Sequence, residues 1–150
     1  MSMTIPSIHQ HLPKAACVVL LDPNGLIAVC SRRNEDIYGL PGGKVDPGET
    51  LVQAAARETQ EEIGVALNPS HLHSLYAAPC AGGKTFWVET FVAELPEGMS
   101  IQQMESDIEV KWTTWQEFLQ CNAFPEYNNA VAKSFEYWME NRYNDSGPSF

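Results

Sequence analysis

The sequence predicts an α/β domain in which two helices cover opposite faces of one β-sheet. Residues 15–21 and 26–31 are apolar runs that are typical of buried strands, and the first is rich in β-branched side chains. A helix is predicted within 43–65 and another over 125–143, because apolar residues recur there at intervals of three and four. The order of strands and helices along the chain therefore indicates the α/β class.

Length and composition indicate one domain spanning residues 1–150. A chain of 150 residues fits one domain, and contents of 44% hydrophobic and 19% charged residues are those of a globular protein. Residues 1–13 are polar and contain two prolines, and residues 145–150 follow the last predicted helix. Both terminal segments are expected to be loosely held.

The charge balance limits the partners of the chain. Nine basic residues against nineteen acidic residues give a net charge of −10. Such a surface repels a nucleic-acid backbone, so a nucleic-acid partner is unlikely, and an anionic substrate needs a local cation. The run 15–21 is far shorter than the roughly 20 apolar residues of a membrane span. We expect no membrane partner, and the oligomeric state (monomer or homodimer) stays open.

The cysteines point to a reducing compartment. They are far apart in the sequence and form no CxxC pair, which argues against a metal-binding cluster of thiols. Free thiols are the rule where disulfides do not persist, so a cytoplasmic location is expected. The four residues are Cys17, Cys30, Cys80 and Cys121.

The first two strands lead to a candidate phosphate contact. A turn at 23–25 joins 15–21 to 26–31 as a hairpin. Arg32 and Arg33 follow the second strand, next to a glycine-rich loop. A guanidinium there could grip two phosphate oxygens, and the alternative is a solvated pair of charges.

The helix within 43–65 carries an unusual acidic face. Pro47 and Gly48 precede it, and Gly64 stands where a helix C-terminal glycine belongs. The buried stripe is formed by Val52, Ala55, Thr59 and Ile63, and the acidic face by Glu58, Glu61 and Glu62. Like charges at this spacing, near the negative end of the helix dipole, each cost a few tenths of a kcal/mol or more. A bound divalent cation would reverse both penalties, whereas the plain alternative is a solvated acidic face.

The second half of the chain supplies further strands and a pair of aromatic residues. Short strands are predicted over 75–78 and 110–114, a turn over 79–83, and a long strand over 85–95. Phe86 and Trp87, on the long strand, are candidates for stacking a base, although aromatic residues on strands more often belong to the core. Helices are predicted to begin at Trp115 and at Pro125; the second has Val131, Phe135, Trp138 and Met139 on its inward face.

The stretch 43–65 resembles the signature of the Nudix hydrolases, of the MutT-like kind. The matching residues are Gly43, Glu49, Arg57, Glu58, Thr59, Glu61, Glu62, Gly64 and Val65. The one departure is Thr59, where an aliphatic residue is usual. The resemblance implies an α/β/α sandwich with a mixed sheet between helices.

The resemblance also implies roles for the signature residues. Mg²⁺, with Mn²⁺ as a substitute, would be held by the carbonyl of Gly43 and by the carboxylates of Glu58, Glu61 and Glu62. Arg57 would hold an acidic residue in place. Glu49 would orient or support the metal site, or be a simple helix N-terminal charge.

Many relatives carry a further acidic residue on the loop before a late strand with a tryptophan, here Trp112. Glu105 is the first candidate for the general base by this resemblance. Asp107 and Glu109 are rivals, since the position of the loop cannot be fixed from one sequence. Glu61, from the helix, is the second choice.

The implied activity is hydrolysis of a nucleoside diphosphate linked to another group. A nucleoside triphosphate, normal or modified, cleaved to the monophosphate and pyrophosphate is the first expectation. ADP-ribose or another nucleoside-diphosphate sugar is the second, although Pro79 is off the spacing seen in that group. Dinucleoside polyphosphates come third. A regulator that binds nucleotides without cleaving them is the alternative class, and the intact acidic residues argue against it.

Overall fold

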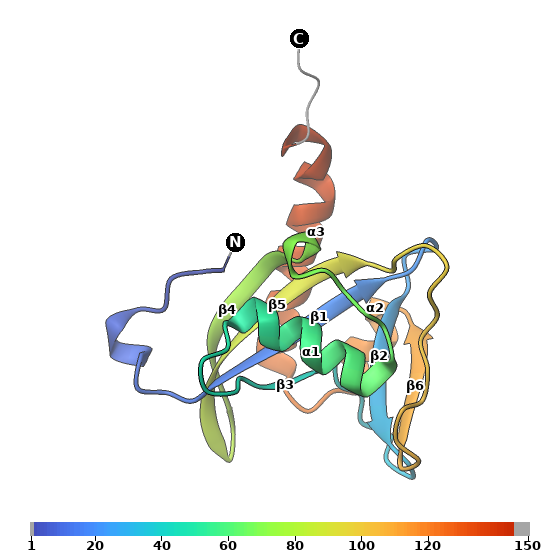
Figure 1. Cartoon of the computed structure of the whole chain (residues 1–150), viewed down its shortest axis with the longest axis horizontal. Helices are drawn as coiled ribbons and strands as arrows, with labels where there is room; N and C mark the ends of the chain where they lie inside the picture. The colour runs from blue at the N-terminus through green and yellow to red at the C-terminus, as the bar shows by residue number, and fades with distance from the viewer. Residues whose placement is uncertain (1, 146–150) are drawn as a thin grey trace.

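The computed structural model of the chain describes residues 2–145. The helices and strands follow one another as η1 (Ser7–His9), β1 (Lys14–Leu21), β2 (Ile27–Arg32), β3 (Gly42–Lys44), α1 (Leu51–Ile63), η2 (Pro69–His71), β4 (His73–Gly82), β5 (Lys84–Glu94), β6 (Ile108–Thr113), α2 (Trp115–Gln120) and α3 (Pro125–Asp145). Figure 1 shows α1 in front of the sheet, with α3 behind it.

One mixed sheet holds all six strands. The order is β4-β5-β1-β2-β6, and β3 also pairs with β1. Strands β1 and β5 run parallel, while the other pairs are antiparallel. Strand β1 is therefore central: β5 lies along one of its edges, and β3 and β2 share the other, with Cys17 opposite Gly42 and Leu21 opposite Ile27.

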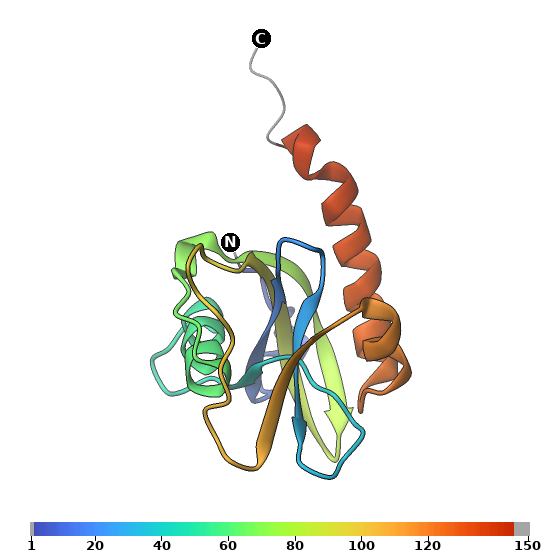
Figure 2. The ribbon, with the colours of Figure 1, turned by 90° about the vertical axis from the view of Figure 1, so that its right-hand side faces the viewer.

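The sheet has a hydrophobic core on each face, and the three layers are seen edge-on in Figure 2. The alternation along β1 sends Val18 and Leu20 into the core with α1, and Val19 and Leu21 into the core with α2 and α3. The α/β/α sandwich with a mixed sheet is thus confirmed. No helix within residues 2–145 has the length and apolarity needed to cross a membrane.

The predicted turn at 79–83 is wrong, because β4 continues to Gly82 and only Gly83 (φ 91°) lies between the strands. Strand β4 is an edge strand, where a proline without an N–H group is tolerated, so Pro79 does not end it. The short strand β3, with two glycines among three residues, was not predicted.

The N-terminal segment, expected to be loose, packs on the sheet. The backbone N–H of Met3 donates to the buried carboxylate of Glu89 at 2.9 Å, and Ser2 donates to the same carboxylate. Ile5 and Leu12 pack against the core beside α1. At the other end, Met139 is exposed rather than inward, and residues 146–150 lie outside the described chain.

Candidate active site

Both ends of α1 are set by local chemistry. Thr50 caps the first turn: its hydroxyl accepts from the N–H of Gln53 at 3.2 Å, and the Gln53 side chain accepts from the N–H of Thr50 at 2.9 Å. Gly64 ends the helix in the left-handed conformation, with φ 71°. These ends place the three carboxylates of the acidic face on the last two turns, beside β3.

The guanidinium of Arg57 joins α1 to the loop that precedes it. It donates to both oxygens of Glu49, at 2.8 and 2.9 Å, and to the carbonyl of Lys44 at 3.0 Å. Its Nη1 donates to Glu58 at 3.0 Å and to Glu61 at 3.2 Å. The hydrogen bonds from Arg57 lower the pKa of Glu49 to about 2. Arg57 does not line the cavity that opens beside the acidic face, described below, so its contacts here are with the acidic groups that it holds in position.

Glu62 is half-buried at the contact between α1 and the sheet. Burial, and then the neighbouring Glu58 carboxylate, raise the pKa of Glu62 to about 7. The backbone N–H of Gly42 and the thiol of Cys30, whose Sγ lies 3.7 Å from Oε2, donate to Glu62 and favour its charged form. They do not offset the burial, so the charge of Glu62 is poorly compensated.

Glu62→Gln is expected to stabilise the metal-free protein at about pH 8 and to change its stability little at about pH 5. The folded-state pKa of about 7 lies above the ordinary 4.5, so the folded protein binds more protons between these values. The wild type therefore loses stability as the pH rises through this window, and a neutral glutamine removes that loss. We expect a gain of the order of 1–3 kcal/mol at the higher pH.

Urea unfolding in a chelator, at both pH values, measures this gain. Glu136→Gln, on the exposed side of α3, is the control for losing one acidic charge. An equal change of the Glu62 variant at both pH values would contradict the assigned burial of its charge.

Gly43 sits directly against the acidic face. A Cβ atom built at Gly43 would lie 2.5 Å from the carboxylate carbon of Glu58, so a side chain there would displace the end of Glu58. The absence of a side chain lets the β3 backbone approach the carboxylates closely. Within residues 2–145, no three acidic, thiol or imidazole side chains converge closely enough to hold a metal as they stand, and Glu58 and Glu61 both bond to Arg57.

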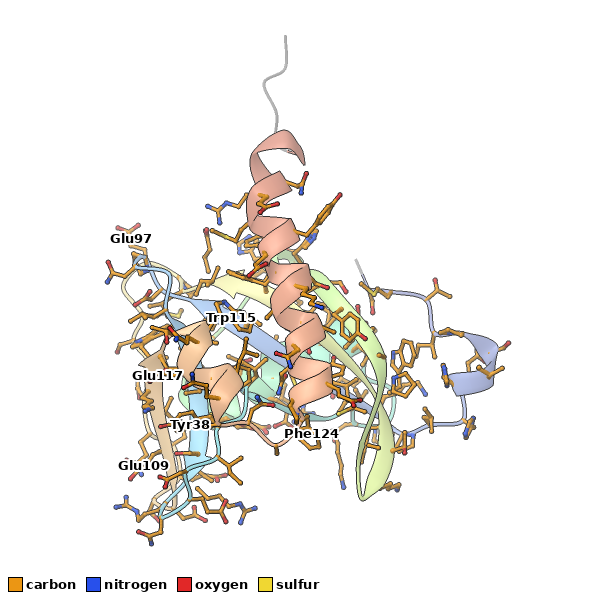
Figure 3. All side chains as sticks on the ribbon, turned by 180° about the vertical axis from the view of Figure 1, so that it is seen from behind. Tyr38, Glu97, Glu109, Trp115, Glu117 and Phe124 are labelled. Atoms are coloured by element: carbon orange, nitrogen blue, oxygen red, sulfur yellow. The ribbon has the colours of Figure 1, made fainter. Side chains whose placement is uncertain are left out.

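A cavity of about 700 Å³ opens beside the acidic face and extends toward α3. Its walls combine three chemical types. The acidic groups are Glu35, Glu58, Glu61, Glu62 and Glu105; the cations are Arg32, Lys44 and Lys84; the aromatic rings are Tyr38, Phe86, Phe124 and Tyr127. Figure 3 shows Tyr38 and Phe124 at the same end of the fold, below α2 and at the start of α3.

Of the three acidic residues predicted as candidates for the general base, one lines the cavity. Glu105 lines the cavity wall, whereas Asp107 and Glu109 do not. The carbonyl of Asp107 accepts the backbone N–H of Arg33 at 2.8 Å. Glu109 lies on the edge strand β6, opposite Ser31, and is seen at the outer edge of the sheet in Figure 3.

In each of the two pairs of predicted substrate contacts, one residue lines the cavity and the other does not. Arg32 lines the cavity, but the guanidinium of Arg33 bonds to the loop before β6 instead. Phe86 lines the cavity, but Trp87 points to the opposite face of β5, since neighbouring residues of a strand alternate. Trp87 is 4% exposed and its ring stacks on His9 at 5.5 Å, so it cannot stack a base in the cavity.

The sequence analysis missed several cavity residues, among them two lysines and two aromatic residues near α3. Lys44 directly follows Gly43, and Lys84 directly follows the hairpin glycine Gly83. Phe124 and Tyr127 surround the start of α3, where only the helix was predicted. The neighbouring glycines were a usable signal for the two lysines. The aromatic pair had none, because their approach depends on how α3 packs on the sheet.

An α/β/α sandwich whose acidic helix borders a cavity lined by cations suits an enzyme that hydrolyses phosphoanhydrides, and comparisons with known proteins point the same way. A family model described as the NUDIX domain matches residues 11–136. Phosphatase NudJ of Escherichia coli K12 is 31% identical over 108 residues, which are 71% of each chain. The fold matches C. elegans Ap4A hydrolase with a TM-score of 0.70 and 23% identity, covering 87% of this chain and 99% of that one.

A further structural match is the NUDIX domain of Shewanella oneidensis NrtR, solved with ADP ribose, with a TM-score of 0.67 and 18% identity over 89% of this chain and 93% of that one. The chain belongs to the Nudix hydrolase family. It is a pyrophosphohydrolase of that family, acting on nucleoside diphosphate derivatives, and members of the family generally use a divalent metal.

Proposed function

We propose that this protein hydrolyses nucleoside triphosphates, normal or modified, to the monophosphate and pyrophosphate in the presence of Mg²⁺. The observation that supports this most is the combination of chemical groups that line one cavity. Carboxylates, cations and aromatic rings all line this cavity, and two of the rings, Phe124 and Tyr127, lie at the start of α3. A nucleotide has matching parts: a metal-bound polyphosphate and a flat base.

The cations of the cavity support a substrate with several negative charges. Of the nine basic residues, Arg32, Lys44 and Lys84 line the cavity, and within residues 2–145 none of these three forms an ion pair. Three cations without an ion pair at one cavity, in a chain of net charge −10, favour a polyphosphate over a substrate with one phosphate.

The acidic end fits a hard divalent cation. Glu58, Glu61, Glu62 and the carbonyl of Gly43 are all oxygen donors, and the missing side chain of Gly43 leaves room beside Glu58. When bound, Mg²⁺ would neutralise phosphate charge and acidify a water molecule. Arg57 keeps Glu58 and Glu61 on the side of α1 that faces this end.

Glu105 is the proposed general base. It reaches the cavity from another segment of the chain than the metal-binding residues, and the structure gives its side chain no hydrogen-bond partner within residues 2–145. A carboxylate not committed to the metal can accept the proton of the attacking water. Glu61 is the second candidate for this role.

The substrate class is tested with a panel of nucleotides and Mg²⁺. Nucleoside triphosphates, nucleoside diphosphates, ADP-ribose and a dinucleoside tetraphosphate are each incubated with the protein, and the products are separated by anion-exchange chromatography. We expect the triphosphates to be cleaved fastest, with pyrophosphate released in one step. Preferential cleavage of ADP-ribose or of the dinucleotide would overturn the proposal.

Stepwise removal of orthophosphate is the second candidate function. The name of the relative from Escherichia coli, phosphatase NudJ, favours it. The same panel separates the two functions, because stepwise hydrolysis releases orthophosphate and accumulates the diphosphate, while attack between the first two phosphates releases pyrophosphate.

Lys84→Gln is expected to raise KM for triphosphates by about tenfold while KM for ADP-ribose changes less. The ammonium group of Lys84 lies 5.7 Å from the centre of the Phe86 ring, at a wall of the cavity. We assign this cation to the third phosphate of the substrate, which ADP-ribose lacks. Lys133→Gln, on the exposed surface of α3, is the control. Equal changes for both substrates would count against selection of the phosphate chain by Lys84.

A further inference from the structure

Arg33 turns away from the cavity and binds the loop that carries Glu105. Its Nε and Nη2 donate to the carbonyl of Ser106 at 3.3 and 3.0 Å, so one planar guanidinium grips one oxygen with two N–H groups. Its backbone N–H donates to the carbonyl of Asp107 at 2.8 Å. The end of β2 is therefore joined to the loop at two successive residues, 106 and 107.

Gln103, on the same loop, binds this stretch as well. Its Nε2 donates to the carbonyl of Glu105 at 3.0 Å and to the carbonyl of Ser106 at 3.2 Å. The carbonyl of Glu105 also accepts the N–H of Ile108 at 3.2 Å. Both side chains thus bond to the Ser106 carbonyl, and Gln103 also bonds to the carbonyl of Glu105.

Glu105 needs such support because little else holds its position. Residues 102–107 are all exposed, and Glu105 itself is not buried against the core. A carboxylate on an exposed loop reaches a reacting water only as accurately as its backbone is held. A misplacement of about 1 Å can cost roughly 10²-fold in rate, and supporting hydrogen bonds are what prevent it.

We propose that Arg33 and Gln103 form a clamp on the carbonyls of Glu105 and Ser106, and that Arg33 is a positioning residue for the general base. The two neighbouring arginines then have different tasks: Arg32 faces the cavity, and Arg33 sets the loop that delivers Glu105. This inference rests on the proposed role of Glu105 in the function above.

The clamp predicts an effect on turnover rather than on substrate binding. Arg33→Gln is expected to lower kcat by roughly 10- to 100-fold with KM changed less than threefold, because Arg33 acts through Glu105. Arg32→Gln, the matched neighbour, is expected to raise KM instead. Arg33→Lys, which keeps one donor for the Ser106 carbonyl, should recover part of the lost kcat. Amide hydrogen exchange over 103–108 should be faster in Arg33→Gln than in the wild type.

A double-mutant cycle of Arg33→Gln and Glu105→Gln completes the test. With Glu105 already replaced, the loss of Arg33 should change kcat less than twofold, because the group that it positions is gone. Two results would overturn the clamp alone, provided that Glu105→Gln strongly lowers kcat. The first is a kcat of Arg33→Gln equal to that of the wild type. The second is a double variant in which the two losses of kcat are fully additive. A neutral Glu105→Gln would overturn the general-base role and the clamp together. The product panel reports on the substrate class independently of both.

Discussion

Chelation of divalent cations is expected to abolish turnover by this protein, and Mg²⁺ or Mn²⁺ is expected to restore it. The acidic face of α1 is costly without a cation: three carboxylates lie near the negative end of the helix dipole, and Glu62 is half-buried with a raised pKa. Arg57 bonds to Glu58 and Glu61, but within residues 2–145 it forms no hydrogen bond with Glu62. Hydrolysis is measured in a chelator and after adding back each metal.

Two further measurements tie this dependence to the acidic face. Mg²⁺ that binds only the folded protein must raise its melting temperature, by an amount that grows with the metal concentration. Glu62→Gln should weaken this shift and lower turnover by at least about 10²-fold, since a metal supplies several kcal/mol of charge stabilisation and each 1.4 kcal/mol is tenfold. Glu136→Gln serves as the control. Full turnover in the chelator would remove the metal from the proposed function.

The position of the acidic helix could be predicted because its determinants are local. Thr50 and Gln53 form a cap within one turn, and Gly64 ends the helix with a backbone conformation that few other residues adopt. The strands β1 and β2 were predicted for a similar reason, since each is a continuous apolar run. Local chemistry of this kind can be recognised in one sequence without knowing the neighbours in space.

The cavity residues were harder to predict because their roles depend on the face of a strand or on the direction of an exposed side chain. Phe86 and Trp87 are both aromatic residues on the same strand, and the alternation of side chains along a strand says only that one of them can face the cavity. Arg32 and Arg33 pose the same choice, which the loop before β6 decides by offering the Ser106 carbonyl to Arg33. Lys84 reaches the cavity only because β4 continues through Pro79 to a tight hairpin.

Glu105→Gln is expected to lower kcat by at least about 10²-fold, the lower end of the range for losing a general base. The carboxylates of α1 would be committed to the metal, while Glu105 approaches the cavity from the loop between β5 and β6. The glutamine keeps the shape of the side chain and removes its proton affinity. The Mg²⁺-dependent shift in melting temperature should change less than in Glu62→Gln.

The two neighbouring acids provide matched controls from the same part of the chain. Asp107 and Glu109 do not line the cavity, so Asp107→Asn and Glu109→Gln should retain turnover within about twofold of the wild type. A severe loss in Glu109→Gln with a neutral Glu105→Gln would move the base to β6 and contradict the orientation of this loop. If all three variants keep full activity, the proton is taken by another acid of the cavity wall, either a carboxylate of α1 or Glu35. Glu61, which is 57% exposed and bound only by Arg57, then becomes the residue to replace.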